Sequence, residues 1–165
     1  MEPGPPGRGL IAFETVDYEV HTERPQPRSL AAIRARIPAD RVGPEIIRQL
    51  DVIWPLLRAQ GAATGHNVVV YHGATDGVLT VDVGVEVPAG FVPDVDVQPA
   101  ATPEGEAATA AHFGDYAGLG GAYAALERWC ASNDRRPAGV NWEVYGDWDD
   151  DPAKVRTDVY FLLEP

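Results

Sequence analysis

Cysteine is almost absent from this chain of 165 residues, and the sequence also has no membrane-spanning run and no signal peptide. Cys130 is the only cysteine, so no internal disulfide can form, and four scattered histidines give no spacing typical of a zinc site. No apolar run is long enough to span a membrane, and the chain does not open with the basic and then apolar segments of a signal peptide. We therefore expect a cytoplasmic protein without a metal site.

Basic residues are also scarce, with 13 Lys and Arg against 25 Asp and Glu and a net charge of -12. Direct binding to nucleic acid requires Lys and Arg opposite the phosphates, so this composition argues against it. No Gly-rich loop has the spacing of a phosphate site, so we expect no nucleotide or other cofactor. Acidic surfaces mostly serve solubility, but this one also suits a cationic ligand or a basic partner surface. The oligomeric state stays open.

The remaining composition is that of an ordinary globular domain. Hydrophobic residues make up 45% of the chain, and the length suits one domain with a proper core. Residues 1–15 are rich in Pro and Gly and are expected to form a flexible leader. Residues 16–165 are expected to form the single domain.

Two stretches of the sequence repeat each other. Residues 65–71 align with residues 139–145, with Gly, Asn and Tyr at the same offsets, and residues 82–87 align with residues 158–163. A helical pattern precedes each pair, and a strand pattern precedes each helix. The repeat predicts an α+β fold of two strand-helix-strand-strand units, about residues 16–88 and 105–165. We expect an antiparallel sheet with both helices on one face and a ligand groove between the halves.

Local patterns place the elements. Strands are expected at residues 18–21, 29–37, 68–71, 79–87, 107–113, 141–145 and 157–163. One helix should run from about residue 43 to Gly61, kinked or split at Pro55, and Asp115 should cap the other. Residues 88–103 are long for a loop, so part of them should be strand or a flap.

The most informative strand contains an acid between aromatic and polar neighbours. Asn141, Glu143 and Tyr145 alternate with Val140, Trp142 and Val144, so the two sets point to opposite faces. We expect the helices to cover the Val-rich faces, such as Val83–Val85–Val87 and Val159–Phe161–Leu163. The other face would then carry the polar set together with Tyr71, Asp158 and Tyr160. That face forms either a pocket wall or a plain solvent face, as in any one-sided antiparallel strand.

An ordered set of residues resembles a known family. It comprises residues 112–116, Trp129 near the end of a helix, residues 142–145 and residues 157–160. Together they resemble the GyrI-like small-molecule-binding family, which also forms the effector-binding domain of AraC-type and MerR-type transcription regulators. The resemblance covers about residues 16–165. We find no helix-turn-helix, so a standalone domain that does not bind DNA is expected.

The resemblance implies that Glu143 faces hydrophobic, often cationic, ligands and that Tyr145 and Tyr160 stack on them, as in multidrug sensing or sequestration. The full set of expected ligand-binding residues is Glu143, Tyr145, Asn141, Tyr160, Tyr71 and Trp142.

Two other functions stay open. Some members of the family hydrolyse cyclopropane-containing alkylators; here Glu143 would be the catalytic base, with Tyr145 or Tyr160 as hydrogen-bond donor and Asp158 the only plausible second carboxylate. One type of member inhibits DNA gyrase, so the third alternative is an acidic protein inhibitor.

Overall fold

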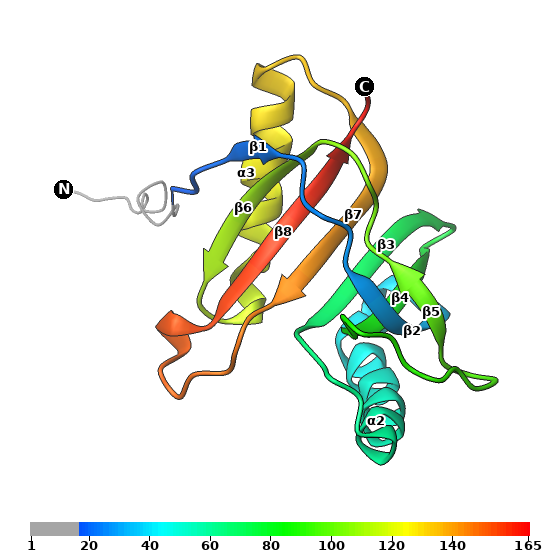
Figure 1. Cartoon of the computed structure of the whole chain (residues 1–165). Helices are drawn as coiled ribbons and strands as arrows, with labels where there is room; N and C mark the ends of the chain where they lie inside the picture. The colour runs from blue at the N-terminus through cyan, green and yellow to red at the C-terminus, as the bar shows by residue number, and fades with distance from the viewer. Residues whose placement is uncertain (1–16) are drawn as a thin grey trace.

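The computed structural model describes residues 17–165 and builds them around one eight-stranded antiparallel sheet. The strand order is β1-β6-β8-β7-β3-β4-β2-β5, and two long helices accompany the sheet (Figure 1). The α+β class with helices on one face is therefore confirmed. The expected leader, residues 1–15, lies outside the described residues.

Each half follows the predicted order. The first half has β1 (His21–Glu23), β2 (Ser29–Pro38), α2 (Val42–Gln60), β3 (Asn67–Thr75) and β4 (Val78–Glu86). The second has β5 (Gln98–Ala101), β6 (Ala107–Phe113), α3 (Leu119–Ser132), β7 (Pro137–Tyr145) and β8 (Arg156–Leu163).

Most local signals have the expected effect. Asp76 and Gly77, both with positive φ, form the two-residue turn between β3 and β4. Gly61 ends α2 in the left-handed conformation. One detail was wrong: Asp115 makes no side-chain cap, and a 3-10 turn at Tyr116–Gly118 separates it from α3. Helix α2 continues through Pro55, so it is not split there.

The strand registers show that the duplication is real. In the central pair, Asn67 lies opposite Tyr145, Val69 opposite Glu143, and Tyr71 opposite Asn141. A two-fold axis between Val69 and Glu143 therefore exchanges the two aligned segments. The outer pairs obey the same relation, since Val83 faces Val69 as Val159 faces Glu143. The repeat seen in the sequence is the pseudo-symmetry of the sheet.

The short strands at the sheet edges are exchanged between the halves. Strand β1 precedes β2 in the chain but pairs with β6, and β5 precedes β6 but pairs with β2. The chain therefore crosses the sheet twice, between β1 and β2 and between β5 and β6 (Figure 1). These crossings tie the halves into one domain.

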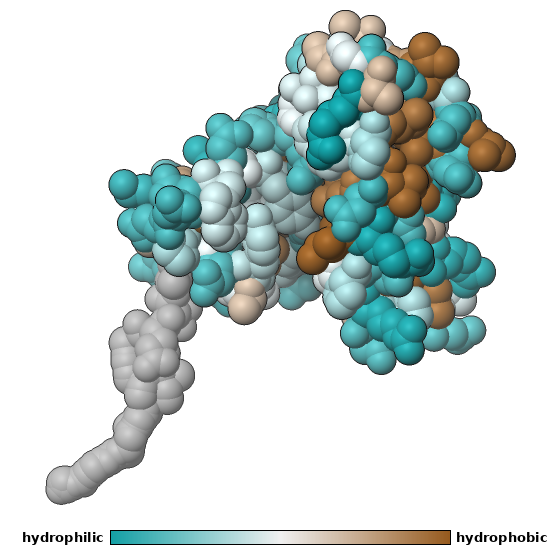
Figure 2. All heavy atoms as spheres, turned by 90° about the horizontal axis from the view of Figure 1, so that it is seen from below, coloured by the Kyte–Doolittle hydropathy of each residue, from teal (hydrophilic) through white to brown (hydrophobic). Residues whose placement is uncertain are grey.

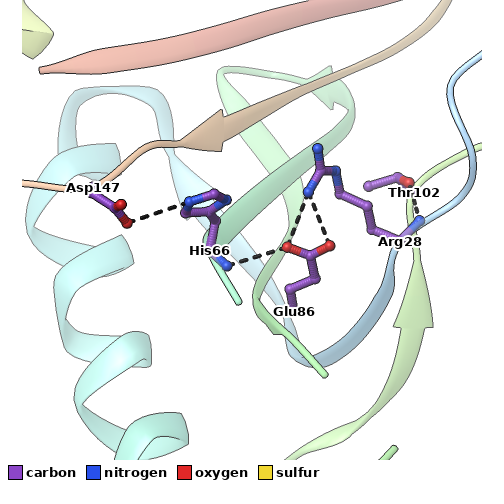
Figure 3. Close-up of polar contacts among 5 residues, drawn as sticks. All are labelled: Arg28, His66, Glu86, Thr102 and Asp147. Carbon is purple, nitrogen blue, oxygen red and sulfur yellow. Dashed lines mark hydrogen bonds and ion pairs between the residues drawn. The ribbon is translucent and has the colours of Figure 1, made fainter. Parts of the chain in front are cut away.

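A polar network holds the crossings on the face without helices (Figure 3). Arg28 donates through Nη1 to both carboxylate oxygens of Glu86 at 3.0 and 2.9 Å, and its backbone N–H donates to Thr102 Oγ1 at 2.8 Å. Glu86 Oε1 also accepts from the backbone N–H of His66, whose ring lies 3.4 Å from Asp147 Oδ1. The two crossings are thus fastened to each other, and the first of them to the end of β4.

Apolar packing fills both faces of the sheet. Helix α3 covers Val159, Phe161 and Leu163, and helix α2 covers Val83 and Val85. Leu30, Val68, Val70, Trp142 and Tyr160 form a separate cluster on the opposite face. Because each helix covers only its own half, the strands at the centre, β3 and β7, lie between the two helices.

Candidate functional site

A groove follows the centre of the sheet between α2 and α3. It contains two adjoining hollows. The first, of about 410 Å³, is lined by Val42, Tyr71, Gly73, Ala74, Leu79, Tyr123, Asn141 and Glu143. The second, of about 540 Å³, is lined by Val42, Gly43, Ile46, Ile47, Leu50, Asn67, Tyr71, Tyr116, Leu119, Tyr145, Gly146 and Trp148. We call them the Glu143 hollow and the α2 hollow. Val42 and Tyr71 line both.

Glu143 lies at the pseudo-two-fold axis, where β7 meets β3. It is 4% exposed, yet no ion pair with Glu143 exists among residues 17–165. A buried carboxylate normally has a charged partner. Its symmetry mate is Val69, so the duplicated frame carries a charge on one side only.

Phenol hydroxyls take the place of a counter-charge. Tyr123 from α3 donates to Glu143 Oε2, and Tyr145 from the same strand donates to Oε1. Asn141 Nδ2 donates to the Tyr123 hydroxyl at 3.2 Å, which leaves the phenol hydrogen free for Glu143. Both carboxylate oxygens are therefore hydrogen-bonded by neutral donors.

Burial and hydrogen bonding shift the pKa of this carboxylate in opposite directions. Burial raises the pKa of Glu143 above its usual range, and the hydrogen bonds from Tyr123 and Tyr145 lower it in part. Burial and the nearby Glu143 charge raise the pKa values of Tyr71, Tyr123 and Tyr145. The three phenols accordingly keep their protons at neutral pH, and Tyr123 and Tyr145 donate theirs to Glu143.

The structure brings together four of the six residues singled out from the sequence. Asn141, Glu143 and Tyr145 point to the helix face of β7, and Tyr71 points there from the facing part of β3. The prediction that this polar set lies on the face away from the helices was wrong. The register pairs Glu143 with Val159, so both point toward the helices, and the gap between α2 and α3 leaves room for the groove.

Trp142 and Tyr160 lie on the opposite face, so the prediction that they share a groove with Glu143 was wrong. They face each other across β7 and β8, and their rings stack with centroids 5.0 Å apart and an angle of 5° between planes. Tyr160 is 7% exposed within the cluster that also holds Leu30 and Val68. Asp158 lies opposite Val144 on that same face and pairs with Arg156, which removes it as a second carboxylate in the groove.

Tyr123 was not predicted as a site residue, because it falls on the apolar stripe of α3 with Leu119, Leu126 and Cys130. Its ring packs against that of Phe161 with the two centroids 5.7 Å apart, as expected of a core residue. The available signal was chemical: a tyrosine on a buried helix stripe needs a partner for its hydroxyl. In the structure, the partner of the Tyr123 hydroxyl is the carboxylate of Glu143.

The outer lip of the groove is apolar and exposed. Trp148 from the β7–β8 loop is 72% exposed, Ile47 on α2 is 62% exposed, and Tyr116 before α3 is 49% exposed. The Tyr116 ring meets that of Tyr145 edge to face at 5.6 Å. Figure 2 shows that hydrophobic residues gather on the side of the molecule that carries α2, whereas most of the rest of that view is hydrophilic.

Residues 17–165 contain neither a cluster of metal ligands nor a membrane-spanning helix. No group of three or more His, Cys, Asp and Glu side chains is arranged to hold a metal ion in that part of the chain. No helix there is long and apolar enough to cross a membrane.

Comparison with known proteins agrees with this geometry. The model of the GyrI-like small molecule binding domain matches residues 19–164, so the chain belongs to the GyrI-like family. No curated protein matches the sequence.

Solved structures share the fold at low sequence identity. The C-terminal domain of EcmrR superposes with a TM-score of 0.70 at 19% identity, over 89% of this chain and 98% of that one. SAV2435, solved bound to tetraphenylphosphonium, gives a TM-score of 0.66 at 12% identity, over 90% and 94%. A protein of Listeria innocua described as a hydrolase gives 0.57 at 12% identity, over 93% and 95%.

Proposed function

We propose that this protein binds hydrophobic monocations in the Glu143 hollow. The observation that carries the proposal is the buried carboxylate of Glu143, which has two phenol donors and no cationic partner among the described residues. A ligand cation supplies the missing counter-charge, and desolvation in the hollow strengthens the attraction. The bound phosphonium in SAV2435 is in keeping with such a ligand, although that likeness rests on fold alone.

The tyrosines favour a soft, weakly hydrated cation over a metal ion. Tyr71 and Tyr123 line the hollow beside Glu143, and the faces of such rings attract cations by about 0.5–2 kcal/mol each. A quaternary ammonium or phosphonium group has no hydrogen to donate and loses little hydration on entry. Recognition by shape and charge in such a hollow tolerates several ligands, which suits multidrug sensing or sequestration.

The test uses two probes of nearly equal shape. Methyltriphenylphosphonium is a cation, and triphenylphosphine oxide is its neutral near-isostere. We expect calorimetry to give at least about tenfold tighter binding of the cation, because each 1.4 kcal/mol of attraction is tenfold in Kd. Equal affinities for both probes would show that the carboxylate does not act as counter-charge.

The second candidate function is hydrolysis of a strained alkylating compound by the same carboxylate. The favouring observation is the raised pKa of Glu143 beside two phenol donors, since a general base works best with a pKa near the working pH. Tyr145 and Tyr123 would be the hydrogen-bond donors, because Tyr160 lies on the other face. Incubation with a cyclopropane-containing alkylator, followed by mass spectrometry, separates turnover from a one-to-one complex released unchanged.

A further inference from the structure

The α2 hollow differs in chemistry from the Glu143 hollow. None of its twelve lining residues is Asp, Glu, Lys, Arg or His, in a chain that is 23% charged. Its walls are aliphatic on the α2 side, with Ile46, Ile47 and Leu50, and aromatic on the opposite side, with Tyr116 and Trp148. Its volume of about 540 Å³ lies within the usual range of small-molecule sites.

Tyr71 and Val42 stand between the two hollows, since both residues line each of them. Tyr71 is further fixed by its place in β3, opposite Asn141. The Tyr145 ring faces the α2 hollow while its hydroxyl donates to Glu143, so the carboxylate itself lies on the other side of the phenol. The α2 hollow thus presents mainly ring faces and aliphatic groups to a ligand, with the amide of Asn67 and no charged side chain.

We propose that the α2 hollow is a second site that binds a neutral aromatic molecule while a small cation occupies the Glu143 hollow. An uncharged flat ring fits between Trp148 and the aliphatic side of α2, where it gains apolar contact and aromatic stacking. A charged ligand finds no partner there. The inference rests on the proposed function only for the identity of the first ligand.

The exposure of the lip supports an occupant of this kind. Trp148 is 72% exposed and Ile47 is 62% exposed, and both line the hollow. Clustered exposed apolar residues mark binding sites more often than scattered ones do. A flat ring inserted between these two side chains would cover both at once.

The experiment uses the full chain and two probes. N-phenyl-1-naphthylamine is neutral and gains fluorescence in apolar sites, and benzyltrimethylammonium is a small quaternary cation. We expect the dye to bind with one-to-one stoichiometry and its Kd to change less than about threefold when the cation is saturating. A dye Kd that rises in proportion to cation concentration would mean one shared site and would overturn the proposal.

Variants of exposed residues separate the two sites. Trp148→Ala should weaken dye binding at least about tenfold, because it removes one wall of the hollow. Ile47→Gln should weaken it about threefold or more, whereas Val52→Gln, on the same helix but outside the lining, should leave it unchanged. Thermal unfolding of each variant shows whether the fold is kept. Unchanged dye binding in folded Trp148→Ala would refute the assignment.

Glu143→Gln distinguishes failure of this inference from failure of the proposed function. It should weaken cation binding roughly 10²-fold and leave dye binding within about twofold. If the cation does not bind even the unaltered protein, the proposed function falls, and the dye series still tests the α2 hollow. Light scattering at each titration point checks for a second copy of the chain: dye displacement on dimer formation would mean that the lip is an interface, contrary to the proposal.

Discussion

Replacing Glu143 with Gln is the sharpest perturbation of the groove. The amide keeps the shape of the side chain and can still accept a hydrogen bond from Tyr123 or Tyr145, but it removes the one charge among the described residues that line the hollow. Two unit charges about 4 Å apart attract by roughly 4 kcal/mol at an effective dielectric constant near 20. The variant keeps the ring faces of the tyrosines, so part of the cation attraction survives.

We therefore expect Glu143→Gln to weaken methyltriphenylphosphonium binding by about 3 kcal/mol, or roughly 10²-fold in Kd. Triphenylphosphine oxide should lose less than about threefold, since it carries no charge. Isothermal titration calorimetry at fixed ionic strength measures both values. Equal losses for the two probes would refute the reasoning, because a charge effect cannot act on a neutral ligand.

Further predictions concern pH, the phenols and the fold. Burial raises the folded-state pKa of Glu143, so the native state holds this proton more tightly and stability is lost as pH rises through the raised pKa. In thermal unfolding at pH 8, Glu143→Gln should therefore be more stable than the natural protein. The difference should vanish at low pH, where Glu143 is protonated in both states. Cation affinity should rise with pH over the same range, as calorimetry at several pH values can show. Tyr123→Phe removes a donor to the carboxylate and should shift that affinity profile to higher pH, with a loss of about tenfold or less near neutrality, whereas Tyr160→Phe on the other face should leave it unmoved. Asp82→Asn breaks the buried contacts with an arginine and a histidine and should cost about 2 kcal/mol, a fall in Tm of roughly 4–8 °C, while the exposed Asp150→Asn should shift Tm by less than about 2 °C.

The duplicated fold could be predicted because its signals are local or repeated. Gly61 and the pair Asp76–Gly77 end elements at the predicted places, and the recurrence of Asn67 and Tyr71 as Asn141 and Tyr145 gave the symmetry of the sheet. The exchange of β1 and β5 between halves was not predicted. Pairings of short edge strands with distant partners leave no periodic pattern in the sequence.

The centre of the site could be predicted, but its face and its full membership could not. Alternation along β7 correctly groups Asn141, Glu143 and Tyr145, yet it does not say which group faces a helix. That choice depends on the register between β7 and β8, which pairs Glu143 with Val159 and Trp142 with Tyr160. Tyr160 was wrongly included because this register leaves no signal in the sequence, and Tyr123 was missed because it lies on the apolar stripe of α3.

A crystal structure of the protein with methyltriphenylphosphonium tests the central claim most directly. The account predicts the phosphonium centre in the Glu143 hollow, in contact with the Glu143 carboxylate and the ring faces of Tyr71 and Tyr123. A cation bound on the opposite face, beside Trp142 and Tyr160, or bound in the groove with Glu143 still shielded from it, would contradict the account.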